Sequence, residues 1–141
     1  MILKDYFPDN SWSLFLDRDG VINERIVDGY VRSWNEFQFL PGVKEALAEL
    51  SALFGRIFIV TNQQGIGKGL MSEEDLKTIH NKMLEEIDSA GGRITKIYYS
   101  PYLAEENHIS RKPNPGMAFQ AGSEFYGVDL KKYIMVGDFD S

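Results

Sequence analysis

The chain is organised around one ten-residue stretch, Leu14-Phe15-Leu16-Asp17-Arg18-Asp19-Gly20-Val21-Ile22-Asn23. Its apolar first part, from Trp12 to Leu16, is too short for a helix and predicts a buried strand. Asp17 and Asp19 follow that strand directly. In an open α/β sheet, ligands bind beyond the carboxyl ends of the strands. Two carboxylates there repel each other, and Mg²⁺ would relieve the repulsion because it prefers oxygen ligands. The alternative is purely structural: Asp17 caps the backbone, and Asp19 and Gly20 turn the chain.

Composition restricts the classes of protein that the chain can belong to. With 141 residues, of which 43% are hydrophobic, it is expected to form a single domain (residues 1–141) with its own core. The net charge of −6 argues against a broad nucleic-acid-binding surface. The absence of cysteine excludes disulfides and thiolate zinc sites. No signal peptide and no membrane-spanning segment is recognisable, so we expect a cytoplasmic protein without a membrane partner.

Strands and helices are predicted to alternate along the chain. The predicted strands cover residues 12–16, 57–60, 94–99 and 133–136. Helical periodicity covers 43–53, then the segment from a Ser72 cap to the glycines at 91 and 92, then the segment from an Asn114 cap to about Gly127. This order predicts an α/β fold with a doubly wound, Rossmann-like parallel sheet and right-handed crossovers. Because the fourth strand is followed only by Gly137 to Ser141, we expect the domain to lack its C-terminal strand and helix.

Functional groups of several kinds are predicted to meet at one edge of this sheet. Thr61 and Asn62 follow the second strand, Asp138 follows the fourth, and Arg111-Lys112 precedes the third helix. Together with the two acids after the first strand, they supply what phosphoryl transfer needs. Carboxylates hold Mg²⁺, while a cation, a hydroxyl and an amide bind the phosphoryl oxygens. An aspartate can also attack phosphorus and form an aspartyl-phosphate.

Four motifs in this order resemble the haloacid dehalogenase superfamily of phosphotransferases. They are Asp17-Arg18-Asp19-Gly20, Thr61, Lys112 and Gly137-Asp138. Within that superfamily, the fuller strings are similar to the D-glycero-D-manno-heptose 1,7-bisphosphate phosphatases and their relatives, the histidinol-phosphate phosphatases. Those strings are Asp17 to Asn23, Asp28-Gly29-Tyr30-Val31, Thr61-Asn62-Gln63-Gln64-Gly65-Ile66 and Arg111-Lys112-Pro113-Asn114-Pro115-Gly116-Met117.

The resemblance implies a role for each matching residue. Asp17 would be the nucleophile, and Asp19 the general acid and then the general base. Mg²⁺ would be held by Asp17, the backbone carbonyl of Asp19, and Asp138. Thr61 and Lys112 would steady the phosphoryl group. The substrate, a small phosphorylated sugar, would be contacted by Asp28, Gly29, Tyr30, Asn62, Gln63, Gln64 and Arg111. Such enzymes carry a minimal cap, and we expect a monomer.

One departure from the family pattern concerns a loop. The relatives usually carry a zinc loop of cysteines and one histidine before the Arg-Lys pair, whereas residues 100–110 here contain no cysteine, so no zinc is expected. The expected activity is Mg²⁺-dependent hydrolysis of a small sugar phosphate; the favoured substrate is D-glycero-D-manno-heptose 1,7-bisphosphate, and histidinol phosphate is the alternative within the class. A catalytically weak relative that only binds its ligand is the alternative from another class.

Three further features are given structural interpretations. Gly65 to Gly69 lacks the spacing of a P-loop, which makes Lys68 a solvated loop charge. His80 lies beside the apolar face of its helix and is interpreted as a packed histidine. His108, with Glu105 and Glu106, lacks the ligand set of a structural zinc site.

Overall fold

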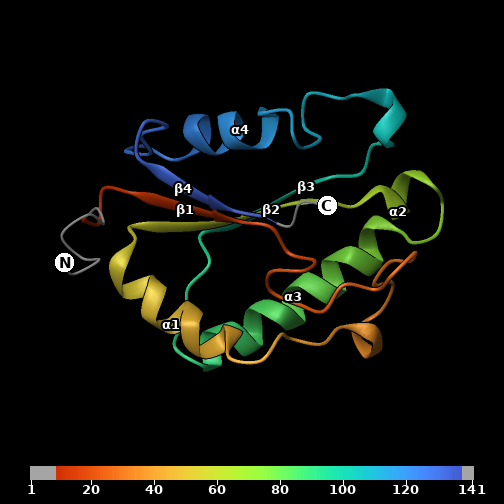
Figure 1. The fold of residues 1–141 in the computed structure, drawn as a ribbon, viewed down its shortest axis with the longest axis horizontal. Coiled ribbons are helices and arrows are strands. Elements are labelled where there is room, and N and C mark those ends of the chain that lie inside the picture. Colours follow the sequence, from red (N-terminus) through yellow and green to blue (C-terminus); the bar gives the residue numbers. More distant parts are fainter. Residues whose placement is uncertain (1–8, 138–141) are drawn as a thin grey trace.

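The computed structural model describes residues 9–137, and its centre is a four-stranded parallel sheet with the strand order β3-β2-β1-β4 (Figure 1). In the register, Phe15 on β1 lies between Phe58 on β2 and Met135 on β4. The strands are β1 (Ser13–Leu16), β2 (Arg56–Asn62), β3 (Lys96–Ser100) and β4 (Tyr133–Val136). The prediction of a parallel α/β sheet is confirmed.

Helices cover both faces of the sheet, which makes a three-layer molecule. In Figure 1, α1 (Val43–Leu53) and α3 (Glu73–Ser89) lie below the sheet, and α4 (Gly116–Glu124) lies above it. A capping box begins α3, because the Ser72 hydroxyl accepts from the Asp75 N–H and the Asp75 carboxylate accepts from the Ser72 N–H. The acids in its first turn suit the positive end of the helix dipole.

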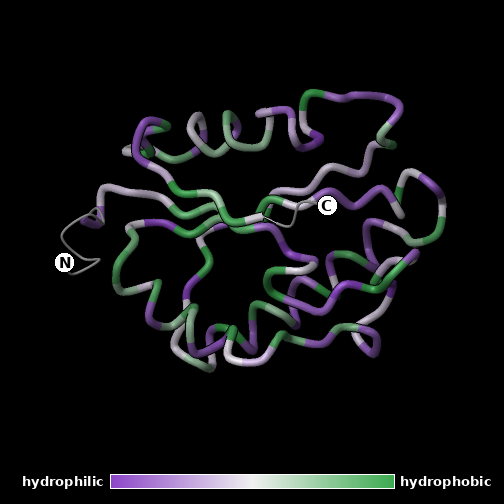
Figure 2. Tube along the Cα trace, viewed as in Figure 1, coloured by the Kyte–Doolittle hydropathy of each residue, from purple (hydrophilic) through white to green (hydrophobic). Residues whose placement is uncertain are grey.

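The core has two parts because strand side chains alternate between faces. Leu14 and Leu16 belong to the larger cluster, between the sheet and α1 and α3, where Ile79 and Met83 are fully buried. Phe15 points the other way and stacks on Phe58 beneath α4, with ring centroids 5.0 Å apart. The central strands are correspondingly hydrophobic in Figure 2, as is typical of strands covered on both faces.

Short helices and loops lie at the edge where the strands end. These are the 3-10 helices η2 (Trp34–Glu36) and η3 (Ala104–Glu106) and the single-turn α2 (Gln64–Gly67). Figure 1 shows them gathered at the carboxyl ends of the strands. Within residues 9–137, no helix has the length and apolar character needed to cross a bilayer.

Several predicted boundaries differ from the observed ones. The second strand continues through Thr61 and Asn62, because both residues pair with β3. The turn α2 was not predicted, since four residues are too few to show helical periodicity. The predicted Asn114 cap is wrong: Pro115 is the N-cap of α4, and the Asn114 amide instead donates to Asn107 and His108.

Candidate active site

Asp17 lies at the end of β1 and forms an ion pair with Lys112. The distance from Lys112 Nζ to Asp17 Oδ1 is 2.9 Å, and the Asp17 side chain is only 1% exposed. The backbone N–H of Arg18 also donates to Oδ1. The other oxygen, Oδ2, is buried and has no hydrogen-bond partner among the residues described. A buried carboxylate with one satisfied and one unsatisfied oxygen is suited to a further ligand, because leaving a charged oxygen unpaired is costly.

Asp19 accepts hydrogen bonds from three neighbouring side chains. Its Oδ1 accepts from Arg18 Nη2 at 2.8 Å and Nε at 3.2 Å, and from Asn23 Nδ2 at 2.9 Å. Its Oδ2 accepts from Gln63 Nε2 at 3.0 Å. Burial alone would raise the pKa of Asp19, but the Arg18 charge and the bonds from Asn23, Arg18 and Gln63 outweigh burial and lower that pKa. Gly20 has φ 86°, so the turn after Asp19 suits a residue without Cβ.

Thr61 and Gln63 lie beneath this pair of acids rather than at the surface. Both are 1% exposed, and Gln63 Nε2 donates to Thr61 Oγ1 at 3.0 Å as well as to Asp19. The Gln63 backbone is held by a bond from its N–H to the Ser100 carbonyl. The Gln63 side chain therefore lies beneath the acids, and its amide nitrogen already donates to Thr61 and Asp19.

Asn62 joins β2 to the segment that carries Lys112. The Lys112 N–H donates to Asn62 Oδ1 at 2.9 Å, and Asn62 Nδ2 donates to the Lys112 carbonyl at 3.2 Å. A side-chain amide that pairs with both backbone groups of one residue fixes the position of that residue. The lysine ammonium is thereby held against Asp17.

Residues 100–114, which contain the Arg111-Lys112 pair, are held by side-chain contacts. The rings of Tyr102 and His108 are stacked, with centroids 3.7 Å apart. Ser110 Oγ donates to Ser100 Oγ on β3 at 2.9 Å. The Asn114 amide donates to the carbonyls of Asn107 and His108. These contacts anchor both sides of Arg111.

A polar pocket of about 460 Å³ opens beside the two acids. Two cations that sequence reasoning did not assign to the site, Arg25 and Lys68, line it, and Lys68 Nζ lies over the Tyr30 ring at 5.3 Å. Each follows a quoted motif string closely in the sequence, but the resemblance assigns no role to either residue. Asp28 adopts the left-handed conformation, with φ 57°. The predicted site residues that line this pocket are Asp17, Asp19, Asp28, Gly29, Tyr30, Asn62, Gln64 and Arg111.

Arg111 has a buried donor in this region. Its Nη1 atom is buried without a hydrogen-bond partner in the described part of the chain. Arginine carries only donors, and a buried unsatisfied donor costs free energy. An anionic or hydroxyl group of a bound molecule would satisfy it.

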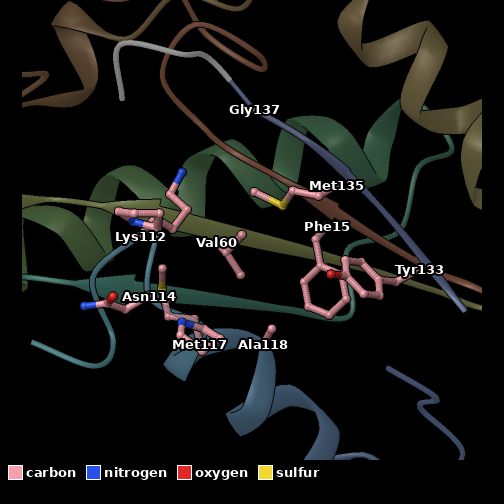
Figure 3. A pocket seen from close by; sticks show the side chains of 11 residues that line it. Phe15, Val60, Lys112, Asn114, Met117, Ala118, Tyr133, Met135 and Gly137 are labelled. Carbon is pink, nitrogen blue, oxygen red and sulfur yellow. The ribbon is translucent and has the colours of Figure 1, made fainter. Parts of the chain in front are cut away.

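A second pocket, of about 500 Å³, lies on the α4 side of the sheet (Figure 3). Phe15, Val60 and Met117 give it apolar walls, and Lys112 lies at the end away from Tyr133. A phosphate would find few hydrogen-bond donors there. We therefore place the candidate active site in the polar pocket, which both acids line.

The residues present suit a divalent cation of the hard, oxygen-binding type. The unpartnered, buried Oδ2 of Asp17 is the observation that supports this, since Mg²⁺ binds carboxylate and carbonyl oxygens. Residues 9–137 contain no cluster of three acidic or histidine side chains that could hold a metal. Asp138, the third predicted ligand, lies outside the described residues.

Comparison with known proteins gives consistent results. A family model described as polynucleotide kinase 3 phosphatase matches residues 15–140. The chain is 44% identical, over 92% of its length and 68% of the relative's, to the D-glycero-alpha-D-manno-heptose-1,7-bisphosphate 7-phosphatase of Mycobacterium tuberculosis. It is 40% identical, over 89% of its length and 70% of the relative's, to the D-glycero-beta-D-manno-heptose-1,7-bisphosphate 7-phosphatase of Vibrio cholerae.

A solved structure shares the fold. The D,D-heptose 1,7-bisphosphate phosphatase of B. bronchiseptica, complexed with magnesium and phosphate, has a TM-score of 0.82 and 36% identity, covering 90% of this chain and 70% of that one. The fold, the family model and the identity to these relatives agree. The chain is therefore a phosphatase of the haloacid dehalogenase superfamily and belongs, within it, to the family of the heptose 1,7-bisphosphate phosphatases.

Proposed function

We propose that this phosphatase removes the 7-phosphate of D-glycero-D-manno-heptose 1,7-bisphosphate through an aspartyl-phosphate on Asp17, with Mg²⁺ as cofactor. The observation that carries the proposal is the buried Asp17 carboxylate, which pairs with Lys112 and keeps one oxygen unpartnered among the described residues. The names of the relatives support the substrate, and the magnesium and phosphate of the B. bronchiseptica structure support the cofactor and the ligand class.

In the first step, the Asp17 carboxylate attacks phosphorus and an oxygen–phosphorus bond forms. The bond from phosphorus to the sugar oxygen breaks, and Asp19 gives its proton to the departing alkoxide. Lys112 supplies positive charge beside Asp17, where the phosphoryl oxygens gather negative charge. The departing sugar oxygen thereby leaves as a neutral hydroxyl, and the phosphoryl group stays on Asp17.

In the second step, water attacks the aspartyl-phosphate and Asp19 takes up the water proton. Inorganic phosphate leaves and Asp17 returns to its carboxylate form. Asp17, the Asp19 carbonyl and Asp138 would hold Mg²⁺, which would neutralise charge on the phosphoryl oxygens. Thr61 is bonded to Gln63, and we assign both to keeping the acids in place beneath the phosphoryl group.

The polar pocket supports a substrate with a second anionic group. Arg25, Lys68 and Arg111 line it, and Arg111 has an unsatisfied donor. The 1-phosphate of a heptose bisphosphate suits these cations, whereas histidinol phosphate carries a cationic amine at its other end. Asp28, Gly29, Tyr30 and Gln64 offer polar groups to the sugar hydroxyls. We therefore favour the bisphosphate over histidinol phosphate.

The test is phosphate release from a panel of substrates, with Mg²⁺ and with EDTA. The panel contains both anomers of heptose 1,7-bisphosphate, the 7-monophosphate and histidinol phosphate. We expect Mg²⁺-dependent release that is fastest with a bisphosphate, and no release by Asp17→Asn. Faster turnover of histidinol phosphate would overturn the substrate assignment. Ligand binding without turnover would identify a binding-only relative.

A further inference from the structure

Arg18, the residue between the two acids, is the largest fully buried side chain of the described molecule, with 0% exposure. Removing a guanidinium from water is costly unless it is fully paired. Its partners are Asp19 Oδ1, at 2.8 Å from Nη2, and His80 Nε2, at 3.0 Å from Nη1. Its carbon Cζ lies 6.0 Å from the centre of the Phe37 ring. The mechanism proposed above gives this arginine no role.

The two oxygens of Asp19 have unequal surroundings. Oδ1 accepts two bonds from Arg18 and one from Asn23, which leaves it no capacity for a further proton. Oδ2 accepts only the bond from Gln63 among the described residues, and Asp19 lines the polar pocket. A proton that moves between Asp19 and a substrate must therefore be carried by Oδ2.

We propose that Arg18 is a positioning residue that saturates Oδ1 of Asp19 and so reserves Oδ2 for proton transfer, and that His80 fixes Arg18 from behind. This inference rests on the proposed function, in which Asp19 is the general acid and base. When the Oδ2–H bond breaks, its proton goes to the leaving alkoxide and its electrons stay on the carboxylate. Arg18 then faces the full negative charge at Oδ1 and holds the product carboxylate in place.

His80 links Arg18, and through it Asp19, to helix α3. Arginine has donors only, so Nε2 of His80 must be the acceptor, and the ring proton is then on Nδ1. His80 is 7% exposed and therefore presents a rigid, neutral acceptor to Arg18. A helix that begins more than 50 residues after Asp19 thus sets the orientation of the acid.

Substrates with different leaving groups can show whether Arg18 positions Asp19 for proton transfer or only stabilises the fold. The ratio kcat/KM reports the steps up to cleavage of the phosphorus–oxygen bond. An alkyl leaving group, as in the heptose bisphosphate, needs a proton at that step, whereas p-nitrophenolate does not. We expect Arg18→Lys, which replaces the two nitrogens that donate to Oδ1 with a single ammonium nitrogen, to lower kcat/KM about 10- to 100-fold for the bisphosphate and less than about threefold for p-nitrophenyl phosphate.

The matched control is Arg56→Lys, because Arg56 lies at the opposite end of β2 and packs on Phe125. It should leave both kcat/KM values unchanged. Equal losses for both substrates in Arg18→Lys would overturn the inference and leave the proposed function standing. A wild-type chain that hydrolyses neither substrate would overturn the proposed function and the inference together.

Two His80 variants give an independent test if Arg18→Lys does not fold. His80→Gln keeps an acceptor for Arg18, and His80→Leu removes it. We expect His80→Gln to retain the wild-type ratio of the two kcat/KM values, and His80→Leu to lose activity selectively on the bisphosphate. Thermal melting checks that both variants are folded. Identical ratios in the two variants would contradict the role of His80.

Discussion

At the scale of single residues, the site depends on how each oxygen of its two buried acids is paired. Oδ1 of Asp17 forms an ion pair with Lys112, and Oδ2 has no hydrogen-bond partner among residues 9–137. Oδ1 of Asp19 accepts three hydrogen bonds, whereas Oδ2 accepts one, from Gln63, among the described residues. In the proposed mechanism, the same amino acid serves as nucleophile at one position and as proton carrier at the other, because the neighbouring donors differ.

Removal of the Lys112 ammonium is expected to impair catalysis strongly. Lys112→Ala leaves the buried Asp17 without its cation and removes positive charge from the phosphoryl oxygens, so kcat/KM should fall by about 10²- to 10³-fold. Steady-state phosphate release measures this. Lys44→Ala is the control, since Lys44 pairs with Glu86 at 3.3 Å on a partly exposed surface. A loss of less than about threefold in Lys112→Ala would show that the lysine does not act on the phosphoryl group.

The role of Asn62 can be separated from sugar contact, which its motif also predicts. Asn62→Ala loses both bonds to the Lys112 backbone, so we expect about 1–3 kcal/mol of destabilisation and a displaced ammonium. Because Lys112 serves every phosphate ester, kcat/KM should fall equally for the bisphosphate and for p-nitrophenyl phosphate. A loss confined to the sugar substrate would instead identify Asn62 as a sugar contact.

At the scale of elements, helix α3 both covers the sheet and supports the turn that carries Asp19. Its apolar side packs Leu76, Ile79 and Met83 into the larger core cluster. His80, one residue beyond Ile79, reaches Arg18 from the same helix. The stability of α3 and the geometry of Asp19 are therefore coupled.

The capping box of α3 should make a measurable contribution to stability. Ser72→Ala removes the acceptor of the Asp75 N–H and is expected to lower the free energy of unfolding by about 0.5–2 kcal/mol, as measured by urea denaturation. Ser89→Ala, at the exposed last residue of the same helix, is the control and should stay within about 0.5 kcal/mol of wild type. Equal effects of the two variants would mean that the cap contributes nothing.

At the scale of the whole molecule, buried and paired ionisable groups make stability depend on pH. Burial, followed by the Arg18 charge, lowers the pKa of His80 to about 3, against the opposing effect of Asp19. Between this value and the ordinary 6.5, the unfolded chain binds more protons at His80 than the folded one, so stability rises with pH. The slope for one such group is at most about 1.4 kcal/mol per pH unit.

We therefore expect the free energy of unfolding to fall as the pH is lowered from 6.5 to 4.5, and to fall less in His80→Gln. Below 4.5 the acids add to the effect, because hydrogen bonds from Lys96 and then Tyr98 lower the pKa of Glu124 to about 2. Urea denaturation at several pH values measures the slope. Equal slopes in wild type and His80→Gln over 4.5–6.5 would contradict the assignment.

Much of the sheet was predictable from local pattern, and much of the site was not. The continuous apolar runs at β1, β2 and β4 identify strands wherever they lie in the chain, and those of β1 and β2 are buried. The Asn62–Lys112 pairing and the Arg18–His80 contact join residues 50 and 62 positions apart. No periodicity relates such positions, so His80 was interpreted only as a packed residue and Lys68 only as a solvated one.

The sequence by itself determined the alternation of strands and helices, the parallel sheet and the residues that end its strands, because periodicity and turn chemistry are local properties. Only the tertiary structure decided which atoms those residues use. It turned Gln63 beneath the acids and placed Arg25 and Lys68 in the pocket. The reason is physical: a hydrogen bond or ion pair depends on distances of about 3 Å between groups, and those distances are set by packing between segments remote in sequence.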